Sequence, residues 1–440
     1  MAHASTWEPM STGLREVAER ARREPEGRFH SLAHRIDQAA LERAYRRLRA
    51  DAAVGVDGVT KEAYGERLEE NLRDLHERLR SRRYRHQPLR RVHVPKEGGG
   101  LRPIAVSALE DKIVQGALRE VLEAVYEQDF MDCSYGFRPG RSAHGAIRAL
   151  HGGMQGSKVN WIVEADIASF FDSVDRATLQ EILRIRIADG SLRRLIGKCL
   201  QVGVLEGESF IDPELGTPQG SALSPLLGNV YLHHVLDRWF EREVKPRMAG
   251  RVILTRYADD FVLGFERRDD AERVMAVLGK RLGRFGLALQ TGKTRLVPFG
   301  RPPRDHRGKG PGTFDFLGFT WSWRRTRRGS WRVACTTRRA RRRRILQSVS
   351  RYCRRHRHEP VAVQHTALTS SLRGHYNYFG VNGNARSLRG VGRQAMRIWF
   401  KWLNRRSQKR SFTWERFNAL LRKYPLPVPR ITVQIWGSAP

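Results

Sequence analysis

The chain has 440 residues, with 81 Lys or Arg against 46 Asp or Glu, a formal net charge of +35 and a pI near 11.2. Hydrophobic residues make up 40% and aromatic residues 9% of the chain, which excludes general disorder. The length predicts two or three domains. The positive charge indicates a polyanionic partner, and nucleic acid is favoured because each neutralised phosphate releases a counterion.

An anionic membrane surface is the alternative partner for so basic a chain. No apolar run approaches the roughly 18 residues that a transmembrane helix needs, and residues 1–10 lack the layout of a signal peptide. We therefore expect a cytoplasmic protein without a membrane partner. The four cysteines contain no CxxC pair, which argues against a zinc module and a disulfide framework: Cys133, Cys199, Cys335 and Cys353.

Residues 1–83 are expected to form a helical N-terminal extension. Residues 32–50 and 64–80 repeat apolar side chains at three- and four-residue steps, which predicts two helices. The glycines and aspartate of residues 54–60 predict a turn between them.

Residues 84–322 mix predicted strands and helices, which indicates an α/β or α+β sheet domain, and we expect the α+β class. Residues 90–95 and 101–104 read as a hairpin around a Gly-rich tip at 96–100, and the other elements follow in chain order. These are a helix over 109–130, a strand over 161–166, a helix over 222–244, two strands over 252–265 and a helix over 271–285.

After Trp321 the composition changes, because residues 321–357 hold fifteen arginines and no acid. Helices are predicted over 361–379, 385–404 and 413–423. A cluster this dense has no acid to pair with, so we expect it to bind an RNA backbone. The candidate RNA-binding residues are Arg338, Arg339, Arg341, Arg342, Arg343 and Arg344.

Three carboxylates carry the catalytic hypothesis. An adjacent Asp pair is often only a solvated turn, but Asp259 and Asp260 lie between two strand-like runs, and Asp166 ends a third. Together they would form the hard oxygen site that Mg²⁺ prefers. Two ions roughly 3.5–4 Å apart stabilise both the attacking and the leaving oxygen of an in-line displacement.

Four motifs, in the same order as in a known family, resemble those of reverse transcriptases. Residues 257–260 (Tyr-Ala-Asp-Asp) look like the YxDD motif, and residues 166–171 like the first catalytic motif. Residues 216–225, around Pro-Gln-Gly, are similar to the segment under the template, and residues 316–319 look like the primer-grip turn.

The resemblance narrows to bacterial group II intron proteins through residues 55–60, residues 134–142 and the Tyr-Pro-Leu-Pro-x-Pro ending of the helical region. It covers about residues 50–430. It implies a right-hand polymerase with fingers and palm over 84–322, a thumb or maturase X domain over 323–386 and a DNA-binding segment over 387–440. Many relatives add an HNH endonuclease, and we expect this chain to belong to the form without one.

The family also implies roles for individual residues. Asp166, Ile167, Asp259 and Asp260 would hold two Mg²⁺ ions, with Mn²⁺ as a substitute. The expected nucleotide contacts are Lys96, Arg102, Phe171, Gln219 and Lys293, and the expected primer grip is Phe316, Leu317 and Gly318. Surface charge is the alternative for Lys96, Arg102 and Lys293. Phe171 resembles a steric gate against the ribose 2′-hydroxyl, whereas Phe170 is expected to pack in the core.

The implied activity is RNA-directed DNA synthesis from deoxynucleoside triphosphates on an RNA template with a DNA primer. The implied partners are structured intron RNA, which the protein would help to splice, and target DNA for target-primed reverse transcription. Two alternatives remain open. One is a host-adapted reverse transcriptase in DNA repair or phage defence, and the other is an RNA-binding splicing cofactor without polymerase activity.

Overall fold

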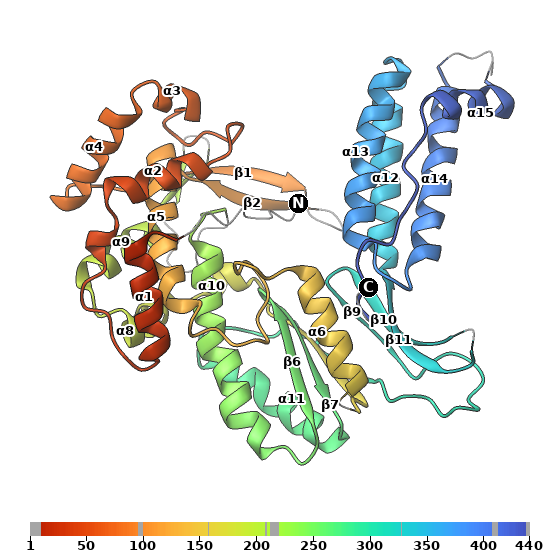
Figure 1. Ribbon diagram of the computed structural model, residues 1–440, viewed down its shortest axis with the longest axis horizontal. Coiled ribbons are helices and arrows are strands. Elements are labelled where there is room, and N and C mark those ends of the chain that lie inside the picture. Colours follow the sequence, from red (N-terminus) through yellow and green to blue (C-terminus); the bar gives the residue numbers. More distant parts are fainter. Residues whose placement is uncertain are drawn as a thin grey trace.

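The computed structural model (Figure 1) describes residues 10–95, 100–156, 158–206, 209–211, 220–326, 328–406 and 412–436. Helices and sheets are mixed, in agreement with the predicted α+β class. None of the helices within these residues is both long and apolar enough to cross a membrane.

The N-terminal region is helical, as predicted. Its helices are α1 (Thr12–Arg23), α2 (Gln38–Arg47), α3 (Lys61–Gly65) and α4 (Leu68–Arg80). The predicted helix over 32–50 is shorter in the structure, because the Asp37 carboxylate caps α2 by accepting from the Ala40 N–H at 2.7 Å. Both α1 and α2 contact α5 (Leu109–Tyr126), whose apolar face is fully buried.

The predicted hairpin is present as β1 (Leu89–Pro95) and β2 (Leu101–Val106), which pair in antiparallel register. With β4 (Val204–Glu206) and β5 (Ser209–Ile211) they form a sheet of order β2-β1-β4-β5.

A second sheet, here named the palm sheet, has the order β6-β7-β3-β8. Its strands are β3 (Trp161–Asp166), β6 (Val252–Tyr257), β7 (Asp260–Phe265) and β8 (Arg295–Pro298). Helix α6 (Ala143–Gly156) contacts β6, and α11 (Arg268–Gly283) contacts β3 and β7. Between β3 and β4 the chain forms the helices α7 (Phe170–Ser173), α8 (Arg176–Arg186) and α9 (Gly190–Leu200).

The predicted helix over 222–244 is not a uniform α-helix. Helix α10 (Ser224–Leu232) continues into two π-helical stretches, His233–Asp237 and Phe240–Val244. Such stretches within helices occur frequently at functional sites. The first of them carries the buried Asp237 side chain into the interior behind the palm sheet.

The arginine-rich segment 321–357 is only partly helical. It forms most of a hairpin of β10 (Phe319–Arg325) and β11 (Trp331–Thr337), followed by α12 (Arg339–Arg355). Trp321 and Trp323 alternate with exposed or half-exposed residues along β10 and face the core. The strand was not predicted from this alternation of buried and exposed residues, because the density of arginines dominated the sequence pattern.

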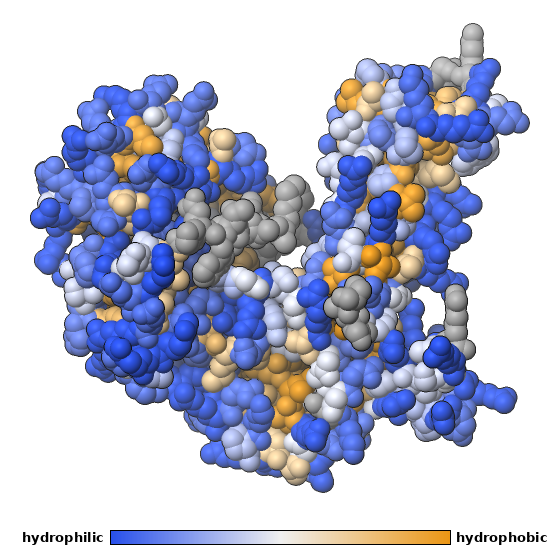
Figure 2. Space-filling model, in the orientation of Figure 1, coloured by the Kyte–Doolittle hydropathy of each residue, from blue (hydrophilic) through white to orange (hydrophobic). Residues whose placement is uncertain are grey.

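The β10–β11 hairpin joins β9 (Thr313–Phe316) in a three-stranded sheet of order β11-β10-β9. Beyond it stand α13 (Val361–Phe379), α14 (Ala385–Leu403) and α15 (Trp414–Lys423), close to their predicted bounds. We name α12, α13 and α14 the C-terminal bundle. Figure 2 shows the surface hollowed between this bundle and the side of the molecule that carries β1 and β2.

Two large apolar cores organise the molecule. One joins the N-terminal helices to α5, α10, α11 and part of the palm sheet. The other joins α6, the three-stranded sheet and the C-terminal bundle. The domain boundaries expected at 322/323 and 386/387 lie within β10 and α14, and the division of the chain into domains stays a prediction.

Candidate active site

The palm sheet brings two of the three predicted catalytic carboxylates onto adjacent strands. Asp166 ends β3 and Asp260 begins β7, and the two residues are direct partners in the antiparallel register. Asp259 lies in the two-residue turn between β6 and β7, where Tyr257 pairs with Asp260. Ala258 in this turn has φ +56°, a left-handed conformation that non-glycine residues rarely adopt.

The carboxyl group of Asp260 is in an environment that disfavours its charge. Burial raises the pKa of Asp260 to about 7, and the nearby charges of Asp259 and Asp166 act in the same direction. The Leu317 N–H donates to Asp260 Oδ2 at 3.5 Å and opposes the rise. A bound cation would offset both the burial and the repulsion.

Lys293 lies at the site, as predicted. Its Nζ donates to Asp166 Oδ2 at 2.5 Å, and the lysine side chain is 61% exposed. The contact holds a proton donor next to Asp166, one of the predicted catalytic carboxylates. It therefore supports a role for Lys293 in the chemistry, which stays a prediction.

The donor set suits a hard divalent cation, because carboxylate oxygens are the ligands that Mg²⁺ prefers. Within the described part of the chain, however, no three His, Cys, Asp or Glu side chains are already gathered as a metal site. One physical reason is that carboxylates repel one another, and Asp166 is turned to Lys293. Ile167 has a buried apolar side chain and pairs with Leu289 in an isolated β-bridge. It could bind a metal only through its backbone carbonyl.

A buried ion pair behind the aspartates was missed in the sequence. The Arg256 guanidinium donates to both Asp237 oxygens at 2.8 and 2.5 Å, and both side chains are fully buried. The same guanidinium donates to Asn229 Oδ1, to Ser134 Oγ and to the Ala258 carbonyl. It therefore holds the backbone of the turn that carries Asp259. The signal available was Arg256 as the one charged residue of β6.

The segment after Cys133 packs against the same turn. A Cβ atom on Gly136 would lie 2.3 Å from the Ala258 nitrogen, so only glycine permits this approach. The Gly136 carbonyl accepts from Asn229 Nδ2 at 2.7 Å. This contact gives a physical reason for the glycine in the Ser-Tyr-Gly-Phe motif.

The predicted primer-grip residues form the turn between β9 and β10. Phe316 pairs with Phe319, and Leu317 and Gly318 have φ +51° and +77°. Both central residues are thus left-handed, as a type I′ hairpin turn requires. The Leu317 contact with Asp260 brings this turn beside the catalytic carboxylates.

Phe171, the predicted gate residue, is more exposed than its neighbour Phe170, as expected. Phe170 is buried in the core at 3% exposure, whereas Phe171 is half-buried, and their rings meet edge to face at 5.1 Å. The placement leaves Phe171 available for the gate role, which stays a prediction.

Three predicted nucleotide contacts lie at or beyond the edge of the described residues. Lys96 and Gln219 fall outside them. Arg102 belongs to β2, where its backbone pairs with Val94 next to the hairpin tip.

The arginine cluster begins at the primer-grip turn. The Arg338 N–H donates to the Gly318 carbonyl at 3.0 Å, and its guanidinium pairs with Asp315 at 2.9 Å. Arg341 lies beside Gly318. The other four members lie on the exposed part of the first turns of α12: Arg339, Arg342, Arg343 and Arg344.

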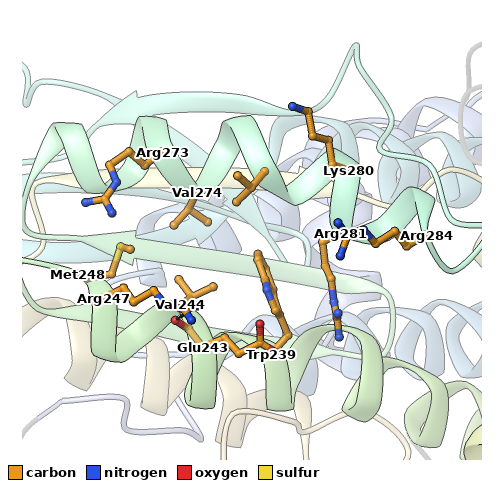
Figure 3. Close-up of a pocket in the computed structure, with 11 residues that line it drawn as sticks. Trp239, Glu243, Val244, Arg247, Met248, Arg273, Val274, Lys280, Arg281 and Arg284 are labelled. Atoms are coloured by element: carbon orange, nitrogen blue, oxygen red, sulfur yellow. Dashed lines mark hydrogen bonds between the residues drawn. The ribbon is translucent and has the colours of Figure 1, made fainter.

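The cavity drawn in Figure 3 is a separate feature. It has a volume of about 360 Å³ and lies between α11 and the helical segment after α10, lined by Trp239, Arg247 and Arg281 among others. None of the predicted catalytic or nucleotide-binding residues lines it. The carboxylate site is therefore identified by its sheet geometry and charge, not by this cavity.

Comparisons with known proteins agree with these observations. Residues 94–321 match the reverse transcriptase (RNA-dependent DNA polymerase) family. The chain is 34% identical to the protein YkfC of Escherichia coli over 64% of this chain and 79% of that protein. It is 35% identical to the group II intron-encoded protein LtrA of Lactococcus lactis over 47% of this chain and 35% of LtrA.

A third relative is an uncharacterized 91 kDa protein in a cob intron of Schizosaccharomyces pombe, 36% identical over 45% of this chain and 24% of that protein. The chain thus spans most of YkfC but only about a quarter to a third of the two intron proteins.

Proposed function

Because the chain belongs to the reverse transcriptase family, of the group II intron kind, we propose that it synthesises DNA on an RNA template and assists the splicing of an intron RNA. The observation that carries the polymerase part is the pairing of Asp166 with Asp260 across β3 and β7, with Asp259 in the adjoining turn. The substrates are an RNA template with a DNA primer and deoxynucleoside triphosphates.

Asp166, Asp259, Asp260 and the backbone at Ile167 would hold divalent cations, Mg²⁺ with Mn²⁺ as a substitute. Two such ions, when bound, supply Lewis-acid stabilisation of the attacking and leaving oxygens. Lys293 would hold a proton near the leaving pyrophosphate, a role that its 2.5 Å contact with Asp166 supports. Phe171 would bar a ribose 2′-hydroxyl, while Lys96, Arg102 and Gln219 would contact the nucleotide or template.

The polymerase part is tested by changing Asp259 and Asp260 together to Ala. Extension of oligo(dT) on poly(rA) with Mg²⁺ should be abolished, because the cations lose ligands on β7 and its turn. The metal-free variant should be as stable as the parent or more stable, since two repelling charges are removed. The matched control is Glu69→Ala with Glu70→Ala, an adjacent and largely exposed acid pair on α4. Extension by the aspartate variant at the control's rate would refute the site.

The intron part rests on the relatives encoded in introns and on the exposed arginines at the start of α12. Intron RNA would bind there through its phosphates, and copying into target DNA would follow by target-primed reverse transcription. The test is to transcribe the DNA flanking the gene and measure its self-splicing with and without the protein. A flanking transcript that neither splices nor binds would favour a host-adapted polymerase.

A further inference from the structure

The turn between β9 and β10 is sterically unusual. A type I′ turn normally carries Asn or Gly at its first central position, because the residue there has a positive φ. Here the position is taken by Leu317, with φ +51°. Backbones in sparsely populated regions persist only where their surroundings hold them, and such residues cluster at active sites.

Three hydrogen bonds hold this turn, from β7, from α13 and from the residue that precedes α12. The Leu317 N–H donates to Asp260 Oδ2 of β7 at 3.5 Å. The Leu317 carbonyl accepts from the Tyr378 hydroxyl of α13 at 3.0 Å, and the Gly318 carbonyl accepts from the Arg338 N–H at 3.0 Å. Leu317 is therefore hydrogen-bonded through its N–H to the first residue of β7 and through its carbonyl to α13 of the C-terminal bundle.

Tyr378 is itself fixed by its neighbours. Its ring lies stacked near Phe319 of β10 at 6.0 Å and near His144 of α6 at 5.6 Å. The His144 Nε2 is also 2.8 Å from the Tyr378 carbonyl. The hydroxyl is therefore directed at Leu317 by contacts from α6 and β10 as well as by its own helix.

We propose that Tyr378 is a positioning residue for the polymerase reaction, linking α13 through the Leu317 residue to the carboxylate of Asp260. The inference rests on the proposed polymerase function. A movement of the C-terminal bundle against the palm sheet would be transmitted to Asp260 through the hydrogen bonds of Leu317 with Tyr378 and with Asp260. Correct seating of a primer–template duplex against the bundle would then favour the productive orientation of Asp260.

The test is Tyr378→Phe, which removes the hydroxyl and keeps the ring. The matched control is Tyr376→Phe on the same helix, because the buried Tyr376 hydroxyl has no hydrogen-bond partner among the described residues. Single-turnover extension of oligo(dT) on poly(rA) is measured across a Mg²⁺ titration, with duplex affinity measured by fluorescence anisotropy and folding by thermal melting.

For Tyr378→Phe we expect the maximal rate to fall roughly two- to tenfold, the range that one net hydrogen bond supports. The Mg²⁺ concentration for half-maximal rate should rise, and duplex affinity should stay unchanged. Tyr376→Phe should match the parent in every measurement.

Two results would overturn the proposal. One is a Tyr378→Phe protein with the parent's rate and Mg²⁺ dependence. The other is a loss confined to duplex affinity, which would make Tyr378 a duplex contact instead. If the parent protein itself extends no primer, the proposed function fails, and that outcome is distinct from both.

Discussion

Single residues buried behind the turn between β6 and β7 hold its backbone in place. Arg256 and Asp237 form a fully buried ion pair, and Arg256 also donates to the Ala258 carbonyl at 2.9 Å. A buried charge is tolerated only where it is paired and its donors are satisfied. The pair and its partners Asn229 and Ser134 therefore act as one polar network beneath Asp259.

Asp237→Asn should destabilise the fold by about 3–5 kcal/mol, because it leaves the Arg256 charge buried without compensation. The measurement is urea denaturation without metal, followed by primer extension at a temperature where the variant is folded. Asp132→Asn is the control, since Asp132 pairs with Arg141 at the surface and is 95% exposed. Its cost should stay within about 1 kcal/mol. Equal costs for the two variants would show that the buried network is dispensable.

At the scale of elements, the start of α5 is anchored by a buried carboxyl group. Asp111 accepts from the Tyr84 hydroxyl at 2.6 Å and from the Gln87 N–H at 3.1 Å. These bonds tie the segment that leads into β1 to the first turn of α5. Burial raises the pKa of Asp111 to about 7, although the Tyr84 hydrogen bond opposes the rise.

This shift makes stability depend on pH. The unfolded pKa of an Asp is about 3.9, so folding favours the protonated form of Asp111. Its contribution to stability is complete below about pH 4 and is lost as pH rises toward 7. Between pH 5 and pH 8 the parent should lose on the order of 2 kcal/mol relative to Asp111→Asn, which cannot ionise.

Urea denaturation of both proteins at the two pH values provides the measurement. His86 lies 3.3 Å from Asp111, and burial lowers the pKa of this imidazole. His86 is present in both proteins, so only the part of its titration that depends on the Asp111 charge enters the comparison. A difference between parent and variant that stays constant with pH would contradict the raised pKa.

At the scale of the whole molecule, charge and core organisation act together. The net charge of +35 opposes compaction unless a polyanion is bound. The C-terminal bundle shares a core with α6, the three-stranded sheet and residues of β3, β7 and β8, so the exposed arginines of α12 lie on an element that packs onto the same core as part of the palm sheet. One basic surface could therefore serve both intron RNA and the primer–template duplex.

The exposed arginines predict a salt dependence. Changing Arg342 and Arg343 to Gln should flatten the log–log plot of RNA affinity against salt by about one unit for each arginine that contacts a phosphate. Arg354→Gln with Arg355→Gln, at the far end of the same helix, is the matched control. Filter binding of a structured intron transcript measures the slopes, and short-primer extension at low salt should fall less than splicing. Parallel loss of both activities would assign the cluster to the duplex alone.

Much of the architecture was predictable from local pattern. Apolar periodicity indicated α5, α11, α13 and the strands β3, β6 and β7, because each buries one face or both. The resemblance to the group II intron family is confirmed by the comparisons. The Asp-Asp pair between two strand-like runs indicated a hairpin turn, and the structure has Asp259 in that turn and Asp260 as the first residue of β7. The metal and nucleotide roles of the predicted residues stay predictions.

The sequence by itself indicated the candidate carboxylates and many of the helices and strands, since both depend on residue types at short spacing. Only the tertiary structure decided what holds them in place. Arg256 meets Asp237, and Tyr378 meets Leu317, across 19 and 61 positions of the chain. No local pattern encodes such pairs, because a long-range hydrogen bond depends on how separate elements pack. The same packing turned half of an arginine-rich segment into the β10–β11 hairpin, whose tryptophans face the core.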